Sequence, residues 1–345
     1  MSWVHIIVCV ITIVGLLIPH TTEKNEDVYI VPEAVTEYVN NTVSKGSLLF
    51  VGDVMLGRNV EKIMSDQGVD HPFQNTKELV QSADVAVLNF EGVVPLTHIP
   101  TPSGVMRFSI KKTYLEHLQS VGFDVLSLAN NHSSDYGLEA LMYTRQLCTD
   151  LKLVCGGSSS EITEESVKIV QVGDISVGII FLHTLFVSPD ISKVKQYMKD
   201  LVGSTSVQIA YVHWGDEYAL VHNTSQKSLA YALIDMGVDA VVGHHPHVIQ
   251  DIEIYKNAPI FYSLGNFIFD QYFSVDVQEG LAVRLEIEDN QHTYTISGVS
   301  SLESRSQPSR MNNDRQTEIL KRILGTYADD ARVQVSEGII SIKHD

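Results

Sequence analysis

Residues 47–58 read SLLFVGDVMLGR, and this stretch sets a pattern that the rest of the chain repeats. SLLFV is an uninterrupted apolar run with the length and composition of a buried β-strand. Asp53 follows where the strand should end, and residues 59–67 then show the apolar spacing of a helix. A buried strand, a polar turn and a helix together form the repeating unit of a layered α/β domain.

Four further apolar runs have the same form, and stretches with helical spacing separate them. The runs are residues 84–90, 123–129, 206–212 and 238–243, and the later helical stretches are residues 77–82, 113–121, 138–147 and 226–236. Runs at 248–255, 259–269, 280–288 and 292–299 follow without intervening helices. The alternation predicts an α/β domain. The later runs predict either a second sheet or an antiparallel extension of the first.

Polar residues follow each of the five expected strands. They are Asp53 and Arg58, then Asn89 and Glu91, then Asn130, Asn131 and His132, then His213 and Glu217, and finally His244, His245 and His247. In open α/β sheets such strand ends converge on one crevice. Separately, Asp53 could cap a helix, Glu91 and Asn131 could serve turns, and His213 could be an ordinary buried histidine. Because five separate explanations are less probable than one, the pattern predicts a shared site.

The residue types at these strand ends suit divalent metal ions. Imidazole, carboxylate and amide oxygen are borderline to hard donors, which suit Zn, Mn, Fe or Mg rather than Cu(I). A bridging carboxylate can hold two ions about 3.5–4 Å apart, and such a pair activates water and polarises a phosphoryl or acyl oxygen. The turn can direct His245 and His247 each to a different ion, with His244 in support. Asn131 offers an oxygen ligand, which leaves His132 free to donate a proton to a leaving group.

Composition and charge exclude several partners. The chain has 345 residues, of which 44% are hydrophobic, and a formal net charge of −18. So acidic a chain lacks the basic face that nucleic-acid binding requires, and an anionic membrane surface does not attract it. A polyanionic partner must therefore be held locally, and metal ions in the predicted site would supply that attraction.

The N-terminus differs from the rest of the chain. Residues 3–18, WVHIIVCVITIVGLLI, are almost wholly apolar, with a length between that of a secretory signal and that of a spanning helix. We expect a signal anchor rather than a cleaved signal or a buried helix, with the domain membrane-anchored outside the cytoplasm or secreted. The expected division is an anchor or signal at 1–20, a polar linker at 21–46, the main domain at 47–300 and a helix and strand extension at 301–345. Outside the cell Cys148 and Cys155 could pair, and burial without pairing is the alternative.

The motifs in their order resemble a known family. They are GDVMLGR (52–58), NFEG (89–92), ANNHSSDYG (129–137), HWGDEY (213–218), GHHPHVIQDIEIYKNAPI (243–260) and FYSLGNFIFD (261–270). Together they resemble capsule-synthesis proteins of the CapA/PgsA type, within the calcineurin-like metallophosphoesterase superfamily. The resemblance implies a metallophosphatase-like αββα sandwich, in which helices flank two facing mixed sheets. It also implies an export-linked role in making poly-γ-glutamate, usually beside membrane-bound partners.

The resemblance further implies a role for each site residue. One ion would take Glu91, Asn131, His213 and His245, the other would take Asp53, Glu91 and His247, and His132 would be the proton donor. Position 55 departs from the superfamily pattern, because Met55 stands where a ligand is usual and a thioether binds hard ions poorly. Arg58 and Glu217 look like additions of the capsule branch, and we expect both to be catalytic. Arg58 would bind a substrate carboxylate as a planar fork, with a structural ion pair as the alternative.

Three functions agree with these residues. The first is a metal-dependent hydrolase or transferase that acts on an amide, ester or phosphoryl bond of an acidic polymer. The second is a non-catalytic metal-binding scaffold for polymer export, and the third is a generic metallophosphoesterase. The Asn131-His132 pair favours the first function, since a scaffold needs no proton donor, and Met55 argues against the third. One or two divalent ions (Zn, Mn or Fe) are expected as cofactors.

Overall fold

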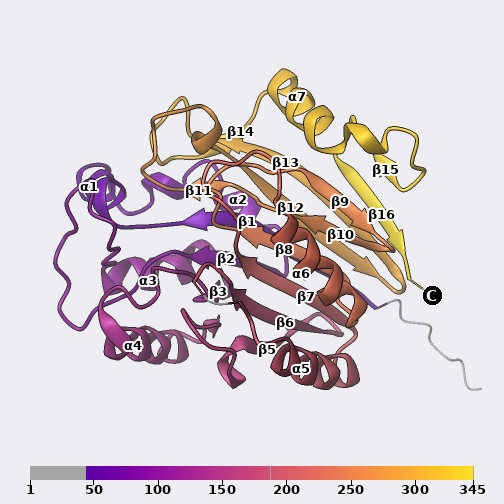
Figure 1. Ribbon diagram of the computed structural model, residues 1–345. Helices are drawn as coiled ribbons and strands as arrows, with labels where there is room; N and C mark the ends of the chain where they lie inside the picture. The colour runs from indigo at the N-terminus through magenta and orange to yellow at the C-terminus, as the bar shows by residue number, and fades with distance from the viewer. Residues whose placement is uncertain (1–43, 187, 345) are drawn as a thin grey trace, which may run out of the picture. The chain divides into compact units, whose positions relative to one another are not determined.

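Two β-sheets pack face to face, and helices cover the outer face of each sheet (Figure 1). The computed structural model describes residues 44–186 and 188–344, which belong to one structural unit, Val43–Asp345. Parallel and antiparallel strand pairs occur in both sheets. The structure thus confirms the expected αββα sandwich of two facing mixed sheets.

The first sheet has β1 at its centre, and the second is built around β7 and β8. In spatial order the first sheet contains β15 (Val333–Gln334), β16 (Ile339–Lys343), β13 (Gln291–Ser300), β12 (Glu279–Glu288), β1 (Lys45–Val54), β2 (Val85–Phe90), β3 (Val125–Ser127) and β4 (Val154–Gly156), with β11 (Asn266–Ile268) beside β1 and β14 (Ser309–Arg310) beside β13. The second sheet contains β5 (Val167–Val172), β6 (Ile175–His183), β7 (Val207–His213), β8 (Ala240–His244), β10 (Ala258–Phe261) and β9 (Ile252–Tyr255).

The α-helices alternate with groups of strands along the chain. They are α1 (Arg58–Gln67), α2 (Lys77–Gln81), α3 (Lys112–Val121), α4 (Gly137–Asp150), α5 (Ile191–Ser204), α6 (Thr224–Asp235) and α7 (Asn313–Leu324). Short 3-10 turns lie at His71–Phe73, Glu164–Ser166, Asp276–Gln278 and Gly325–Tyr327. Helices α1 to α4 pack on the first sheet and α5 and α6 on the second, so both faces of the central strands are buried (Figure 1).

The alternation of side chains along β1 explains why its sequence is apolar at every position. Leu48 and Phe50 enter the core between the two sheets, whereas Leu49 and Val51 enter the core beneath α1 to α4. All four side chains are at most 1% exposed. A strand buried on both faces needs no polar residues, and this is why the uninterrupted run SLLFV predicts a central strand.

Strand register places the polar residues of different strands side by side. Asp53 of β1 lies opposite Asn89 of β2 and also opposite Asn266 of β11. On the second sheet His213 of β7 lies opposite His244 of β8. These neighbouring strands are parallel, so their carboxyl ends lie at the same edge of each sheet.

The structure confirms the five strands that were expected first, and it shows where the later ones go. Both alternatives for the later runs occur, because β9 and β10 join the second sheet whereas β12 and β13 extend the first sheet antiparallel. The sequence analysis missed β4, β5, β6 and α5. Of these, β5 is an edge strand with exposed positions, and its apolar signal is correspondingly weak.

The two ends of the chain were expected to be separate segments. Residues 301–344 contribute α7, β15 and β16, and β16 pairs with β13. The apolar run at 3–18 and most of the expected linker lie outside the described residues, and the predicted boundaries stay predictions. Among the described residues, no helix combines the length and apolarity that crossing a membrane requires.

A disulfide joins Cys148 at the end of α4 to Cys155 in β4. Both cysteines are buried, and they lie seven positions apart in the sequence, so the bond closes a short loop. Pairing of these cysteines is therefore confirmed, and the alternative of two buried free thiols is wrong.

Reducing this disulfide should lower the free energy of unfolding by about 2 kcal/mol, because even a short closed loop restricts the unfolded chain. Urea denaturation with and without a reductant measures the difference. A Cys148→Ala/Cys155→Ala variant is the control, since its midpoint should not respond to the reductant. Equal midpoints for the wild-type protein under both conditions would contradict the expectation.

His292 in β13 should make stability fall in acid. Burial lowers the pKa of its imidazole to about 4, and the nearby His344 acts in the same direction. The unfolded chain titrates near about 6.5, so between these values it binds a proton that the folded state does not. Stability is therefore lost as pH falls from about 6.5 to about 4. In a His292→Phe variant this part of the dependence should disappear, and parallel pH profiles for the two proteins would show that His292 does not contribute.

Candidate metal centre

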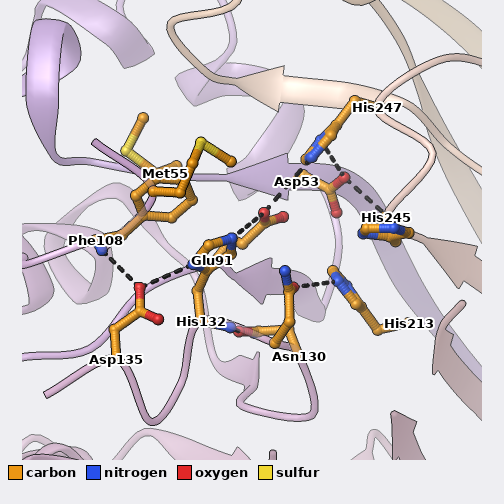
Figure 2. A network of polar contacts seen from close by, with 12 residues as sticks. Asp53, Met55, Glu91, Phe108, Asn130, His132, Asp135, His213, His245 and His247 are labelled. Atoms are coloured by element: carbon orange, nitrogen blue, oxygen red, sulfur yellow. Dashed lines mark hydrogen bonds and ion pairs between the residues drawn. The ribbon is translucent and has the colours of Figure 1, made fainter. Parts of the chain in front are cut away.

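Polar side chains from both sheets meet at the carboxyl ends of the strands (Figure 2). The first sheet provides Asp53 from β1, Glu91 just after β2, and Asn131 and His132 just after β3. The second sheet provides His213 from β7, and His245 and His247 from the turn after β8. Asp53 and Glu91 are wholly buried, and the four histidines are at most 6% exposed. The structure thus brings together all of the predicted ligands and the predicted proton donor.

Asn89 links the two buried carboxylates. Its Nδ2 lies 2.8 Å from Asp53 Oδ1 and 3.3 Å from Glu91 Oε2, so it donates toward both acids. Asn130 Nδ2 in turn donates to Asn89 Oδ1 at 3.1 Å and to the Phe90 carbonyl at 2.9 Å. This chain of amides fixes the two carboxylates relative to each other.

His213 lies between two amides and is neutral. Its Nε2 is 2.8 Å from Asn131 Oδ1, and its Nδ1 is 3.3 Å from Asn89 Nδ2. A ring that donates from Nε2 and accepts at Nδ1 satisfies both contacts. Burial, together with the neighbouring His245, holds the pKa of His213 well below its ordinary value. Neutral imidazole is the form that binds metal ions, and an ion would replace the contact between His213 and Asn131.

The turn after β8 is strained and is held in place by several contacts. His245 and His247 have φ angles of 98° and 58°, in the left-handed region that residues with a side chain rarely adopt. The His245 amide donates to Asp53 Oδ2 at 3.4 Å, and His247 Nδ1 lies 2.9 Å from Asn266 Oδ1 and 3.2 Å from Asp53 Oδ2. Such strain persists where surrounding structure enforces it, and it concentrates at functional sites.

Gly243 permits this turn to sit against β10. A Cβ atom at this position would lie 2.1 Å from the Tyr262 carbonyl oxygen and 2.5 Å from Trp214 Nε1. Since the first of these is a backbone atom, no side chain fits. The glycine that precedes the histidines therefore allows strand β8 to end close enough to its neighbours for His244 to contact Asp53.

The pKa shifts show that the buried acids of the site favour bound protons when no metal ion is present. Burial raises the pKa of Glu91 to about 8, and His247 and the other nearby charges do not reverse that shift. Burial also raises the pKa of Asp53, but hydrogen bonds and attraction from His244 and His247 outweigh it and hold the carboxyl ionised. Burial lowers the pKa of His247, whereas Glu91 and Asp53 together raise it to about 9. Without another cation, His247 must therefore keep a proton to balance the acids.

Several polar side-chain atoms at the site are shielded from solvent and have no hydrogen-bond partner within the described residues. Among the expected ligands these atoms are Glu91 Oε1 and His245 Nδ1, and His183 Nε2 and His244 Nε2 are also without a partner. Glu91 Oε1 lies 3.7 Å from His247 Nε2 and 3.9 Å from His132 Nε2, beyond hydrogen-bond distance. Buried polar atoms without partners are costly, and a divalent cation would satisfy them. The residues therefore fit a metal ion.

Donor atoms lie close enough for metal binding in two groups. The groups are Asp53, Glu91 and His213, and Glu217, His245 and His247, with the donor atoms of each group within 4.8 Å of one another. The resemblance instead implied that His213 and His245 share an ion, and it placed no ligand at Glu217. The structure places His244 with its Nδ1 3.2 Å from Asp53 Oδ1, in the supporting position expected for it.

His132 is oriented by a carboxylate that the sequence analysis did not single out. Its Nδ1 lies 2.8 Å from Asp135 Oδ2, and its ring stacks on Phe108 at 3.8 Å between centroids. Figure 2 shows His132 between Asp135 and Glu91. With Nδ1 bonded to Asp135, the Nε2 atom faces the site, as a proton donor requires.

Arg58 and Met55 are both engaged with the protein itself. Arg58 forms an ion pair with Asp270, and its guanidinium lies 4.6 Å from the centre of the Phe108 ring. This is the arrangement of the structural ion pair given above as the alternative, and catalytic roles for Arg58 and Glu217 stay predictions. Met55 Sδ accepts a hydrogen bond from the Gly57 amide at 3.0 Å, which agrees with a thioether that is not a ligand.

His183, at the end of β6, is a further site residue that the sequence analysis missed. It lies opposite His213 in the sheet, with 5.7 Å between the ring centroids. Its Nδ1 donates to the Ser159 carbonyl at 2.7 Å, and burial lowers the pKa of the ring. The signal that could have found it is the apolar run before it, which ends in histidine as the run before His213 does.

Comparison with known proteins agrees with these motifs. The profile of the family described as bacterial capsule synthesis protein PGA_cap matches residues 47–271, a span that contains every predicted ligand. The chain is 32% identical over 282 residues to the capsule biosynthesis protein CapA of Bacillus anthracis, covering 75% of this chain and 68% of that protein. It is 28% identical over 303 residues to the PGA biosynthesis protein CapA of Bacillus subtilis (strain 168), covering 80% of this chain and 77% of that protein.

A solved structure is also similar in outline. A crystal structure described as a novel phosphatase from Mycoplasma pneumoniae aligns with a TM-score of 0.48 and 14% identity, covering 78% of this chain and 94% of that chain. Similarity at this level assigns no activity. The family profile and the Bacillus anthracis relative do carry an assignment, because together they span most of the described unit. The chain belongs to the family of bacterial capsule synthesis proteins named PGA_cap.

Proposed function

We propose that this protein acts in the synthesis or export of poly-γ-glutamate through a metal-dependent hydrolase or transferase site. The observation that carries the proposal is the pair of buried donor atoms without partners, Glu91 Oε1 and His245 Nδ1, among the described residues. They belong to the two groups of possible metal ligands at the carboxyl ends of the strands. If these strand ends had only a structural role, there would be no reason to bury atoms that can bind a metal ion and to leave them without hydrogen-bond partners.

The relatives support the choice of polymer. The two Bacillus proteins are described as acting in capsule biosynthesis and in PGA biosynthesis. A polymer of glutamate is strongly anionic, and this chain has a net charge of −18, so the two repel each other over roughly 8 Å at physiological salt. Local positive charge from divalent ions would overcome that repulsion at the site and nowhere else.

The chemistry divides between ion-binding residues and His132. Asp53, Glu91 and His213 would hold one divalent ion, and His245 and His247 would contribute to a second. A bound ion supplies Lewis-acid polarisation of the reacting carbonyl or phosphoryl oxygen and a nucleophile at neutral pH. His132 would donate a proton to the leaving group from Nε2 of its imidazolium form, in which both ring nitrogens carry a proton and the neutral ring remains after the transfer. Asp135 accepts a hydrogen bond from Nδ1 and so fixes the direction of the ring.

We also propose that the domain works outside the cytoplasm, either anchored in the membrane or secreted. The apolar run at 3–18 supports export, and so does the Cys148–Cys155 disulfide, because such bonds persist in oxidising compartments. Membrane-bound synthesis proteins would then be the natural partners, together with the polymer or its precursor.

Metal analysis of the full-length chain tests the proposal first. We expect about one to two equivalents of Zn, Mn or Fe by elemental mass spectrometry, and loss of metal in a His245→Ala/His247→Ala variant whose circular dichroism is unchanged. A His71→Ala/His344→Ala variant removes the same number of histidines elsewhere and should retain the metal. If the wild-type protein binds none of these metals after reconstitution, the catalytic proposal fails and only a metal-free scaffold role remains.

His132 should be needed for the reaction and not for metal binding. In the metal-loaded protein, a His132→Gln variant should shorten or transfer poly-γ-glutamate at least about 100-fold more slowly, since it has lost the proton donor. Its metal content should equal that of the wild-type protein. Size-exclusion chromatography of the polymer after incubation provides the measurement. Full activity in His132→Gln would remove this residue from the mechanism.

A further inference from the structure

We propose that Glu217 is a metal ligand, which binds one ion together with His245 and His247 and supplies the ligand that Met55 cannot. The inference rests on the proposed function, because it assumes that the site holds divalent ions. It assigns to Glu217 a role that neither the family match nor the superfamily pattern provides.

The loop that carries Glu217 is tied directly to the histidine turn. Residues 214–223 connect β7 to α6, and the Trp214 amide donates to the His244 carbonyl at 3.0 Å. Further along, the Tyr218 amide donates to the Pro246 carbonyl at 2.8 Å. Because Pro246 stands between His245 and His247, this second bond places the residue before Tyr218 beside both imidazoles.

The backbone of this loop adopts an unusual conformation to achieve that placement. Tyr218 has a φ angle of 65°, in the left-handed region. The Tyr218 hydroxyl accepts a hydrogen bond from Gln271 Nε2 at 3.2 Å, and its ring lies 6.3 Å from that of His247. A residue held in a costly conformation by contacts at both its backbone and its side chain indicates that the position of the loop matters.

The donor atoms of the three residues are already near the spacing that an ion needs. Those of Glu217, His245 and His247 lie within 4.8 Å of one another. Ligand bonds of about 2.0–2.2 Å place donor atoms at most about 4.4 Å apart. Glu217 is exposed, so its flexible side chain can move the remaining distance without disturbing the core.

An independent feature points to a ligand at this place. His245 is 6% exposed, and its Nδ1 has no hydrogen-bond partner in the part of the chain that the structure describes. Among the three residues, the carboxylate of Glu217 is the anionic group, and it would attract a cation to His245 and His247.

Comparison with the adjacent acid Asp216 shows that exposure in this loop does not by itself place a carboxylate beside the histidines. Asp216 precedes Glu217 in the same loop and is also exposed, but its Oδ2 accepts a hydrogen bond from Asn223 Nδ2 at 2.7 Å. Asp216 therefore helps to shape the start of α6, whereas Glu217 groups with the histidines. The two adjacent acids thus form a matched pair for an experiment.

A carboxylate at this position also sets the charge of the site. Asp53, Glu91 and Glu217 together do not neutralise two divalent ions, so the loaded site keeps a net positive charge. An anionic substrate is attracted by that charge. Since Glu217 reaches the site from the solvent side, it is also the ligand that an incoming substrate carboxylate could displace.

Manganese binding to the full-length chain tests the role of Glu217. Mn²⁺ titration followed by electron paramagnetic resonance should detect two bound ions in the wild-type protein. In Glu217→Gln, one ion should bind as before, and the other should bind at least about tenfold more weakly, because it has lost a ligand. Asp216→Asn should match the wild-type protein. Thermal unfolding without metal confirms that each variant is folded.

The possible outcomes separate this inference from the proposed function. If Glu217→Gln binds every ion as tightly as the wild-type protein, Glu217 is not a ligand, and the proposed function stands. If Asp216→Asn weakens binding as much as Glu217→Gln, the effect is one of general loop charge, and the inference also fails. A wild-type protein that binds no Mn²⁺, Zn²⁺ or Fe²⁺ overturns both.

Discussion

The Asp53 carboxylate is wholly buried, and the arrangement of the site follows from the need to compensate that charge. A carboxylate removed from water is tolerated only where several donors surround it. Asn89 donates to it from the first sheet, whereas His244, His247 and the His245 amide approach it from the second. One side chain at the end of β1 therefore joins the two sheets at their carboxyl edge. The sharp turn after β8 brings the His245 amide and the His247 ring to the Asp53 carboxylate.

The compensation is incomplete without a further cation. Glu91 lies beside Asp53 with its pKa raised to about 8 by burial, and one of its oxygens has no partner among the described residues. A protein that only needed stability would replace such a group with an apolar one, since buried charges contribute little net stability. The buried Glu91 carboxyl and the left-handed φ angles at His245 and His247 together fit a site that is preorganised for metal ions. The same preorganisation is what a catalytic site requires.

Much of the fold could be predicted, because burial on both faces leaves a local signal. SLLFV and the four similar runs are apolar at nearly every position, and each became a strand of a sheet that is covered on both sides. The edge strand β5 could not be found in this way, since its exposed positions give no such signal. The division of the later runs between the two sheets could not be predicted either, because β9 and β12 both mix apolar and charged residues and only strand pairing assigns them to different sheets.

The sequence by itself indicated which expected ligands meet, because each lies at or just after the end of a buried strand and parallel strands end at one edge, but it did not indicate His183 or Asp135. It also determined that Met55 is a poor ligand, from the chemistry of sulfur. Only the tertiary structure decided which donors stand together, because Asp53 and Glu91 come from the first sheet and His213 from the second, and their distance depends on how the two sheets face each other. For the same reason, contacts across the fold determined that Asp270 pairs with Arg58 and brought Glu217 to the histidine turn. Local sequence carries no information about such distances.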